Sequence, residues 1–205
     1  MPIRISYSSR EGIFNKCERK FQLYKLLAGT YEKEEAAHFS HGHAFGAGIA
    51  NYFLTKDKAR AKLACWLAYW PNILDEGYSA YHSCIILEGA FPHIDKLMAE
   101  GWELARFNDL PAIELSCRLN INPDFYEVAF LDLAIFNKRL NIYAVFENKT
   151  TGSRLNDITP MYKNSSQTIG YSICLDTISG QRLANFGTFT FVAQQKSKDI
   201  TNLEY

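Results

Sequence analysis

Two apolar stretches in the second half of the chain each contain one carboxylate, and this feature constrains the fold most. Asp132 lies within AFLDLAIF, and Glu147 lies near the end of NIYAVFENK, two residues before Lys149. Both stretches predict β-strands. An ionised carboxylate is costly to bury without a partner. Two acids on successive strands, one of them beside a lysine, therefore predict a shared cation.

The polar and basic residues 137–141 between these stretches predict a hairpin connection. If Phe136 pairs with Asn141, the register places Asp132 opposite Val145. A change of one residue in this register would move the whole set of side chains to the other face of the sheet. The prediction of a shared site therefore depends on the hairpin.

In this register Glu147 and Lys149 share a face with Asp132, because side chains alternate along a strand. Asp132 and Glu147 become diagonal neighbours, roughly 7–8 Å apart at their Cα atoms. Both side chains could then reach one metal ion, at oxygen–metal distances of about 2 Å for magnesium.

An aspartate inside one strand, followed by an acid-x-Lys at the end of the next, resembles the PD-(D/E)xK nuclease superfamily. The letters ENKT of Glu147–Thr150 are similar to the (D/E)-x-K-T core of that superfamily. The resemblance implies an α/β fold with a restriction-endonuclease-like core, in which helices flank a central mixed β-sheet and an N-terminal helical region precedes it.

Two further motifs resemble the RecB-like and phage-exonuclease branch of the superfamily. Gln167 and Tyr171 form a Q-x-x-x-Y spacing on the helix expected after the acid-x-Lys core. Near the start of the chain, Phe14, Cys17 and Phe21 fit the F-x-x-C-x-x-x-(F/Y) helix of the same branch.

The length of 205 residues suits one domain. We expect residues 1–205 to form a single nuclease domain, with 1–110 mainly helical and 111–205 forming the sheet core that carries the catalytic motifs. The sequence predicts strands over 112–121 and 185–195 and a helical segment over 71–107 with turns near its prolines. The stretch that begins at His38, in which small and apolar residues alternate, predicts a closely packed helix, followed by a second helix over 57–70. Glu114 is interpreted as a surface acid at a strand end.

The resemblance implies a metal-dependent DNA nuclease, and it favours an exonuclease over an endonuclease, acting in phage or bacterial DNA recombination or repair. Mg²⁺ or Mn²⁺ would be held by Asp132, Glu147 and the Asn148 carbonyl. Lys149 would orient the nucleophilic water and stabilise negative charge, so Asp132, Glu147 and Lys149 are the expected catalytic residues.

The expected DNA contacts lie outside this trio of catalytic residues. Gln167 and Tyr171, four residues apart on one helix face, would hold the substrate. Lys16, Arg19 and Lys20 form the basic face of an amphipathic helix that is predicted to run to about residue 27. This helix is interpreted either as an ordinary surface helix or as one that also contacts phosphates, and the two interpretations are compatible.

The chain departs from the family pattern in two places. Relatives have a G-x-x-x-H helix whose histidine is a metal ligand, and aligning Gly42 with that glycine puts Gly46 at the ligand position. His43, one turn away, could substitute, or it could be a polar residue at the helix entrance. Some relatives also hold an iron–sulfur cluster, but no cysteine follows Cys174 here. We therefore expect no cluster, and Cys17 is interpreted as a buried packing residue.

Composition adds little that favours a particular partner. The 22 basic and 22 acidic residues give a net charge of zero, so the basic excess typical of nucleic-acid-binding proteins is missing. Acidic metal ligands can offset a local basic groove, so DNA stays the expected partner, with a recombinase or single-strand-binding protein beside it.

Three features of the sequence indicate the cellular setting. No apolar signal peptide and no membrane-spanning run is visible. The five scattered cysteines suit reduced thiols. These features favour the cytoplasm of a bacterial cell or a phage-infected host and no membrane partner.

Two other interpretations stay open. The chain could be a DNA-binding or scaffold module that keeps the nuclease fold with weak catalysis or none. It could also be an unrelated α/β protein whose acids only stabilise the hairpin. Acids on opposite faces of the sheet would exclude the nuclease interpretation.

Overall fold

The computed structural model describes residues 3–6, 16–22, 37–69, 79–151, 166–180 and 185–194. The elements within these ranges are β1 (Ile3–Ser6), α2 (Glu18–Phe21), α3 (Ala37–Thr55), α4 (Lys58–Tyr69), α5 (Ala80–Ala99), β2 (Trp102–Leu104), β3 (Arg106–Phe107), β4 (Leu110–Pro111), β5 (Ile113–Asn120), β6 (Phe125–Asn137), β7 (Ile142–Thr151), α7 (Ser166–Ser179) and β8 (Asn185–Gln194).

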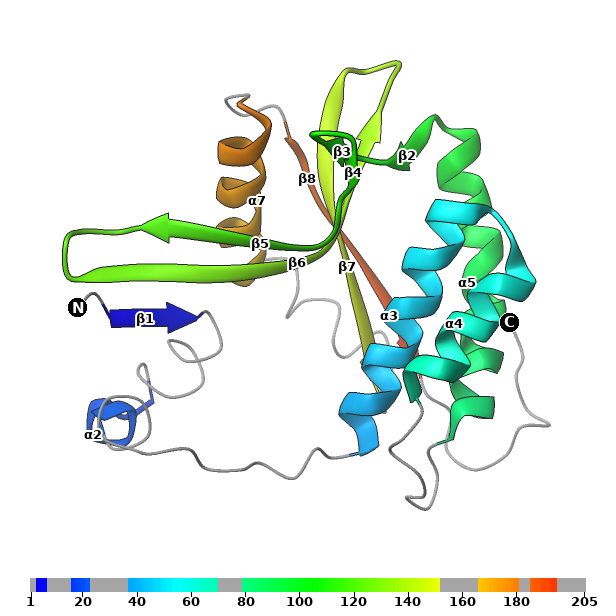
Figure 1. Ribbon diagram of the computed structural model, residues 1–205, viewed down its shortest axis with the longest axis horizontal. Helices are drawn as coiled ribbons and strands as arrows, with labels where there is room; N and C mark the ends of the chain where they lie inside the picture. Colours follow the sequence, from blue (N-terminus) through cyan, green and yellow to red (C-terminus); the bar gives the residue numbers. More distant parts are fainter. Residues whose placement is uncertain are drawn as a thin grey trace.

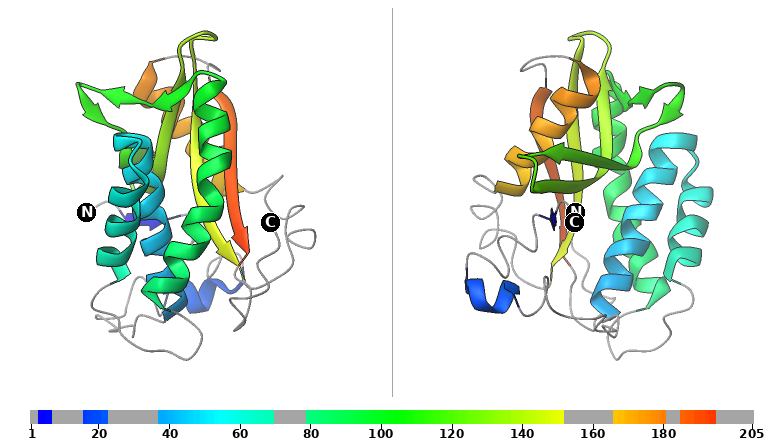
Figure 2. Two further views of the ribbon diagram at one scale, coloured as in Figure 1. Left: turned by 90° about the vertical axis from the view of Figure 1, so that its right-hand side faces the viewer. Right: turned by 60° about the vertical axis from the view of Figure 1, so that its left-hand side comes forward.

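The centre of the fold is a six-stranded mixed sheet built around the long strand β6. β6 pairs antiparallel with β2, β5 and β7, and parallel with β1. β8 continues the sheet by pairing parallel with β7. Helices α3, α4 and α5 lie on one side of the sheet and α7 lies on the other (Figures 1 and 2). The expected mixed α/β architecture, with helices flanking a central mixed sheet, is confirmed at this level.

Helices on both sides bury both faces of the central strands, which explains why β6 and β7 read as nearly continuous apolar runs. Leu133, Ile135 and Phe146 belong to the core under α3 and α5. Ala134 and Val145 belong to the core under α7. All five are fully buried.

Helix α3 packs closely against its neighbours because it carries a glycine at the crossing point. A Cβ at Gly48 would meet the side chain of Leu87 on α5 and lie 3.1 Å from Cβ of Cys65 on α4. The small residues of this stretch predicted such a closely packed helix.

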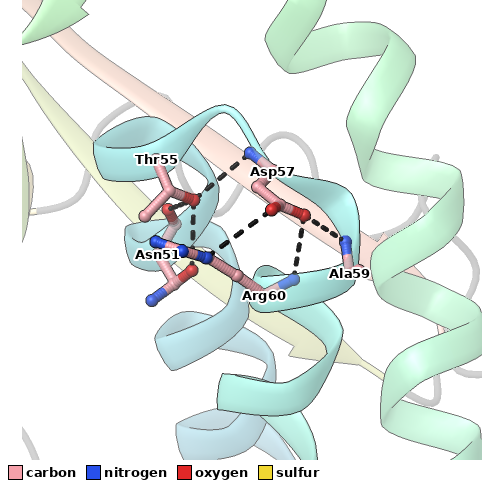
Figure 3. A network of polar contacts seen from close by, with 5 residues as sticks. All are labelled: Asn51, Thr55, Asp57, Ala59 and Arg60. Carbon is pink, nitrogen blue, oxygen red and sulfur yellow. Dashed lines mark hydrogen bonds and ion pairs between the residues drawn. The ribbon is translucent and has the colours of Figure 1, made fainter.

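The turn from α3 into α4 is held by a local network of polar contacts (Figure 3). Oδ1 of Asp57 accepts from the N–H groups of Ala59 at 2.9 Å and Arg60 at 3.1 Å, so Asp57 caps α4. Thr55 Oγ1 donates to the Asn51 carbonyl at 2.8 Å and accepts from the Asp57 N–H at 3.2 Å.

Several predicted elements are confirmed with small changes in their ends, namely α3, α4, β5, α7 and β8. The predicted first helix is described only as α2, because residues 23–27 lie outside the described ranges, as do residues 152–165 of the predicted loop. None of the helices that the structure describes has the length and apolar character needed to cross a membrane.

The prediction of a turn at Pro92 was wrong, because α5 continues through this residue. A proline inside a helix removes the hydrogen bond to the carbonyl four residues earlier, here that of Glu88. Both residues are exposed, so the carbonyl that loses its partner lies on the solvent side of the helix.

The prediction that helix extends to residue 107 was also wrong. Trp102–Leu104 forms β2, which pairs with the end of β6. Trp102 is 5 % exposed and packs edge-on against Phe189. At the start of the chain Ile3–Ser6 forms β1, which also pairs with β6. These short strands gain their stability from pairing with β6, which local sequence does not reveal.

Candidate functional site

The hairpin joins β6 and β7 as expected, but in a different register. Phe136 pairs with Tyr143 and not with Asn141, a shift of two residues. The ladder ends with Leu133 paired to Phe146, so the next residues along the two strands are Asp132 and Glu147. The shift is even, so the paired residues of the hairpin keep the expected parity. Asp132 lines a cavity with residues of α3, whereas Glu147 contacts Gln167 on α7. The two acids are thus the first residues beyond the ladder, whereas the sequence predicted a diagonal pair with Val145 opposite Asp132.

Asn137 is the reason for the shift. It was counted as a loop residue, but it ends β6 and pairs with Ile142. Its buried side chain accepts from the N–H groups of Arg139 at 3.1 Å and Leu140 at 3.2 Å. Asn141 closes the turn in the left-handed region, with φ of 55°.

Asp132 lies where β6 and β7 separate. Beyond Phe146, β7 continues alongside β8, with Glu147 paired to Thr190. The Asp132 carboxylate takes over from the missing strand partner, because its Oδ2 accepts from the Asn148 N–H at 2.7 Å. The fold therefore fixes this carboxylate at a fork in the sheet.

Glu147 is the buried member of the acid pair, with 4 % of its surface exposed. Its Oε1 accepts from Nζ of Lys149 and from Nε2 of Gln167, the latter at 3.4 Å. Its Oε2 is buried and has no hydrogen-bond partner within the part of the chain that the structure describes. A buried carboxylate oxygen without a partner is rare in proteins and asks for an explanation.

Helix α7 brings the Q-x-x-x-Y pair to this carboxylate. Nε2 of Gln167 donates to the Tyr171 hydroxyl at 2.7 Å as well as to Glu147. Tyr171 is 7 % exposed and belongs to the core under α7. The two residues share one helix face, as predicted, and they orient Glu147. Their contact with DNA stays a prediction.

Burial disfavours the ionised forms of both acids, and the charge of Asp132 adds to the effect at Glu147. Burial, followed by the charge of Asp132, raises the pKa of Glu147 to about 7, against the opposing effect of Lys149. Burial also raises the pKa of Asp132, although the Asn148 N–H and the positive charges of Lys149 and His43 oppose it. Like charges this close favour a compensating cation.

A cavity of about 440 Å³ opens between α3 and the fork, and Asp132 and Asn148 form part of its wall. Helix α3 contributes His43, which is exposed, and Gly46. A Cβ at Gly46 would lie 3.9 Å from Nδ2 of Asn148, an ordinary contact distance. The position at which the resemblance expects a histidine therefore faces the cavity, with room for a side chain.

Glu114 is the cavity residue that the sequence analysis missed. It is exposed, as expected for a surface acid, but it lines the cavity with Asp132. Burial and the charge of Asp132 raise the pKa of Glu114, opposed by His43. Glu114 has φ of 50°, and the β5–β6 ladder passes from Ile113 to Leu115 around it. No sequence pattern predicted a residue with a left-handed backbone conformation inside a strand.

The remaining candidates lie apart from these contacts or outside the described residues. Lys16 and Arg19 are exposed on and beside α2, and Arg19 donates to Gln22 at 3.1 Å. The side chain of Lys20 is not among those described. Cys17 is exposed, so its interpretation as a buried packing residue was wrong, and Phe21 is the buried residue of this segment.

The side chains around Asp132 and Glu147 were compared with the ligands that Mg²⁺ or Mn²⁺, the metals that the motifs imply, would need. Within the described ranges, no group of three or more His, Cys, Asp or Glu side chains could hold a metal ion. Asp132 and Glu147 form a pair of oxygen donors, one with an unpartnered oxygen. Magnesium is often bound by one or two carboxylates together with waters and substrate phosphates. The pair fits that kind of site, and it does not fit a closed cage made of protein ligands.

The chain was also compared with known proteins. No protein-family model matches it, and no curated protein matches it. The motifs and the geometry around Asp132 and Glu147 are therefore the basis for a functional proposal.

Proposed function

We propose that this protein is a metal-dependent deoxyribonuclease with a restriction-endonuclease-like core, in which Asp132, Glu147 and Lys149 are the catalytic residues. The observation that carries the proposal is the pair of acids at the strand fork. The two carboxylates lie on adjacent strands, and Lys149 contacts one oxygen of Glu147. The other oxygen, the buried Oε2, has no hydrogen-bond partner among the described residues. A structural ion pair would not need the second acid or leave an oxygen unpartnered.

Each residue has a role that follows from its position. Asp132 and Glu147 would hold Mg²⁺ or Mn²⁺, with the Asn148 carbonyl as a further oxygen donor. Such an ion activates a water and neutralises charge on the phosphate. Lys149, whose side chain is 28 % exposed, contacts the buried acid through Nζ and would orient the attacking water and stabilise negative charge. Gln167 would keep Glu147 in place from α7.

The cavity beside Asp132 is the natural place for the substrate strand. Small residues of α3, Gly46 among them, form part of its wall, and small residues allow a sugar–phosphate backbone to approach closely. The preference for an exonuclease, the recombination or repair setting, a recombinase or single-strand-binding partner, and a bacterial or phage-infected cytoplasm rest on the resemblance and on composition.

A second candidate function is DNA binding with weak turnover or none, on the same fold. One observation favours it: Gly46 faces the cavity without the side chain that the resemblance expects there. His43 lines the same cavity and is the candidate substitute for that ligand.

The test compares end-labelled linear DNA with closed circular DNA in magnesium, in manganese and in EDTA. Wild-type protein is run beside Asp132→Asn and Lys149→Ala, with Lys62→Ala as a matched control, because Lys62 makes its ion pair with Glu88 on another face. Loss of Lys149 is expected to reduce the rate by about 10²–10⁴.

The outcomes separate the candidates. Metal-dependent loss of linear DNA only, absent in the Lys149 variant, supports an exonuclease, whereas nicking of the circle makes the protein an endonuclease. DNA binding without cleavage supports the second candidate, and Gly46→His would then be expected to restore cleavage. Equal rates for wild type, Asp132→Asn and Lys149→Ala would refute the catalytic assignment.

A further inference from the structure

A second cavity, of about 460 Å³, lies at the C-terminal end of α3, beside β2, β3 and the ends of β6 and β7. Three cations line it, and they come from three different parts of the fold: Lys56, Arg106 and Lys138. One acid lines it as well, Glu103, which pairs with Lys138 at 2.9 Å. The lining therefore carries an excess of positive charge, although the chain as a whole is neutral.

Lys56 is held toward this cavity by an unusual backbone conformation. It follows the last residue of α3 with φ of 57°, and its N–H donates to the Tyr52 carbonyl at 2.8 Å. Glycine is the usual residue at such a position, because a side chain there is strained. The adjacent acid, Asp57, is directed to the N-terminus of α4 and to Arg60 (Figure 3).

Arg106 is also held in place, by the two-residue hairpin that joins β3 and β4. The turn residues Asn108 and Asp109 have φ of 50° and 64°, as a tight hairpin turn requires. Nη1 of Arg106 donates to the Asp109 carbonyl at 2.7 Å. This hydrogen bond holds the guanidinium in place, and the side chain remains exposed to solvent.

The wall beside these cations is aromatic. Tyr143 and Phe136 line the cavity, with ring centroids 4.7 Å apart. Tyr143 stacks on Phe107 at 5.5 Å, with an angle of 23° between the planes. All three side chains are half-buried. A supported aromatic face beside two or three cations is what proteins use to bind a base and its phosphate in single-stranded nucleic acid.

The two cavities lie side by side along α3, because Leu54 lines both of them. Leu54 is 45 % exposed. About 12 Å of helix separates Gly46, in the first cavity, from Leu54. At about 3.4 Å per stacked nucleotide, this distance corresponds to roughly three or four nucleotides.

We propose that this second cavity binds a nucleotide unit of a single DNA strand that continues from Asp132 along α3. Lys56 and Arg106 contact its phosphate, and Tyr143 supports its base. The inference rests on the proposed function for the direction of the strand, and its test measures binding separately from cleavage.

The test is the binding of fluorescent thymidylate oligonucleotides by anisotropy in EDTA, where no metal-dependent cleavage occurs. An octanucleotide is long enough to reach from Asp132 to the second cavity, whereas a dinucleotide is not. The variants are Lys56→Gly, Arg106→Gln and their combination. Lys56→Gly removes the cation and relieves the left-handed strain, so a loss of folding would not explain weaker binding.

Two control variants define the specificity of the effect. Lys56→Arg keeps the positive charge at the same position, and Arg60→Gln removes an exposed cation of α4 that pairs with Asp57. Both are expected to bind the octanucleotide like the wild type. The double variant is expected to bind it about tenfold or more weakly. Its salt dependence should be shallower by about 0.7 for each phosphate that the protein no longer neutralises.

Several results would overturn the proposal. These are unchanged binding of the octanucleotide by the double variant, an equal loss for the dinucleotide, an equal loss in Arg60→Gln, or no binding of either oligonucleotide by the wild type. If the cleavage test fails while octanucleotide binding depends on Lys56 and Arg106, the proposed function is wrong and the binding site stands.

Discussion

Replacing either of two helix glycines by alanine tests the packing of the helices, with opposite expected results. Alanine is favoured over glycine inside a helix by about 0.5–1 kcal/mol. At Gly48 the new Cβ would meet Leu87 and lie 3.1 Å from Cβ of Cys65. Both neighbours are fully buried, so neither can move aside into solvent. Overpacking of this kind costs about 1–3 kcal/mol.

The two effects predict a net loss of about 0–2.5 kcal/mol for Gly48→Ala. Gly170 in α7 is the matched control, because a Cβ there meets nothing within 4 Å. Gly170→Ala is expected to stabilise the protein by about 0.5–1 kcal/mol. Thermal unfolding followed by circular dichroism measures both, since 1 kcal/mol corresponds to about 2–4 °C in a protein of this size.

The pair of variants separates packing from propensity. If Gly48→Ala raised the melting temperature as much as Gly170→Ala, helix propensity would dominate, and the close crossing of α3 with α4 and α5 would be refuted. A loss at both positions would instead point to a requirement for glycine in α7 that its open surroundings do not explain.

Two further predictions concern stability. Pro92→Ala should restore a hydrogen bond inside the continuous helix α5 and raise the free energy of unfolding, measured by urea titration, by about 1–3 kcal/mol. A decrease would contradict the interpretation that Pro92 costs α5 one hydrogen bond. His41 is 1 % exposed and contacts Ser83 Oγ at 2.7 Å, and burial, followed by the charge of His82, lowers its pKa from 6.5 to about 4. Because the pKa of His41 is lower in the folded state, the unfolded chain binds the proton first as the pH falls. The stability that the neutral, buried His41 contributes is therefore complete above pH 6.5, and about 3 kcal/mol of it is lost as the pH falls to 4. Between these pH values the melting temperature of His41→Gln should depend less on pH than that of the wild type, and parallel curves would contradict the argument.

Local patterns were sufficient for the long elements, because their periodicity repeats over many residues. The small and apolar residues of the stretch that begins at His38 predicted α3, and the alternation in 185–195 predicted β8. Short elements such as β1 and β2 were missed or assigned to helix. Each pairs with residues of β6 that lie more than 30 positions away in the sequence, and a window of neighbouring residues carries no information about such a partner.

In the candidate site, too, some features followed from local sequence and others depended on the tertiary structure. The apolar runs of the two strands were sufficient to predict that β6 and β7 form a hairpin with one acid each. The register of that hairpin depended on the side chain of Asn137 bonding within the turn, which alternation alone does not predict. The Q-x-x-x-Y spacing placed Gln167 on the correct helix face, but not its bond to Glu147.

By itself, the sequence determined that two strands carry one acid each, that a hairpin joins them, and that a lysine and a helix with a glutamine follow. These properties depend on the order and alternation of neighbouring residues, which the chain contains locally. The tertiary structure alone decided that Glu114 and Gly46 line one cavity with Asp132, and that Lys56, Arg106 and Tyr143 line another. Those groupings come from the crossing of α3 over the sheet and from left-handed residues at Lys56 and Glu114, where packing between distant segments outweighs local preference.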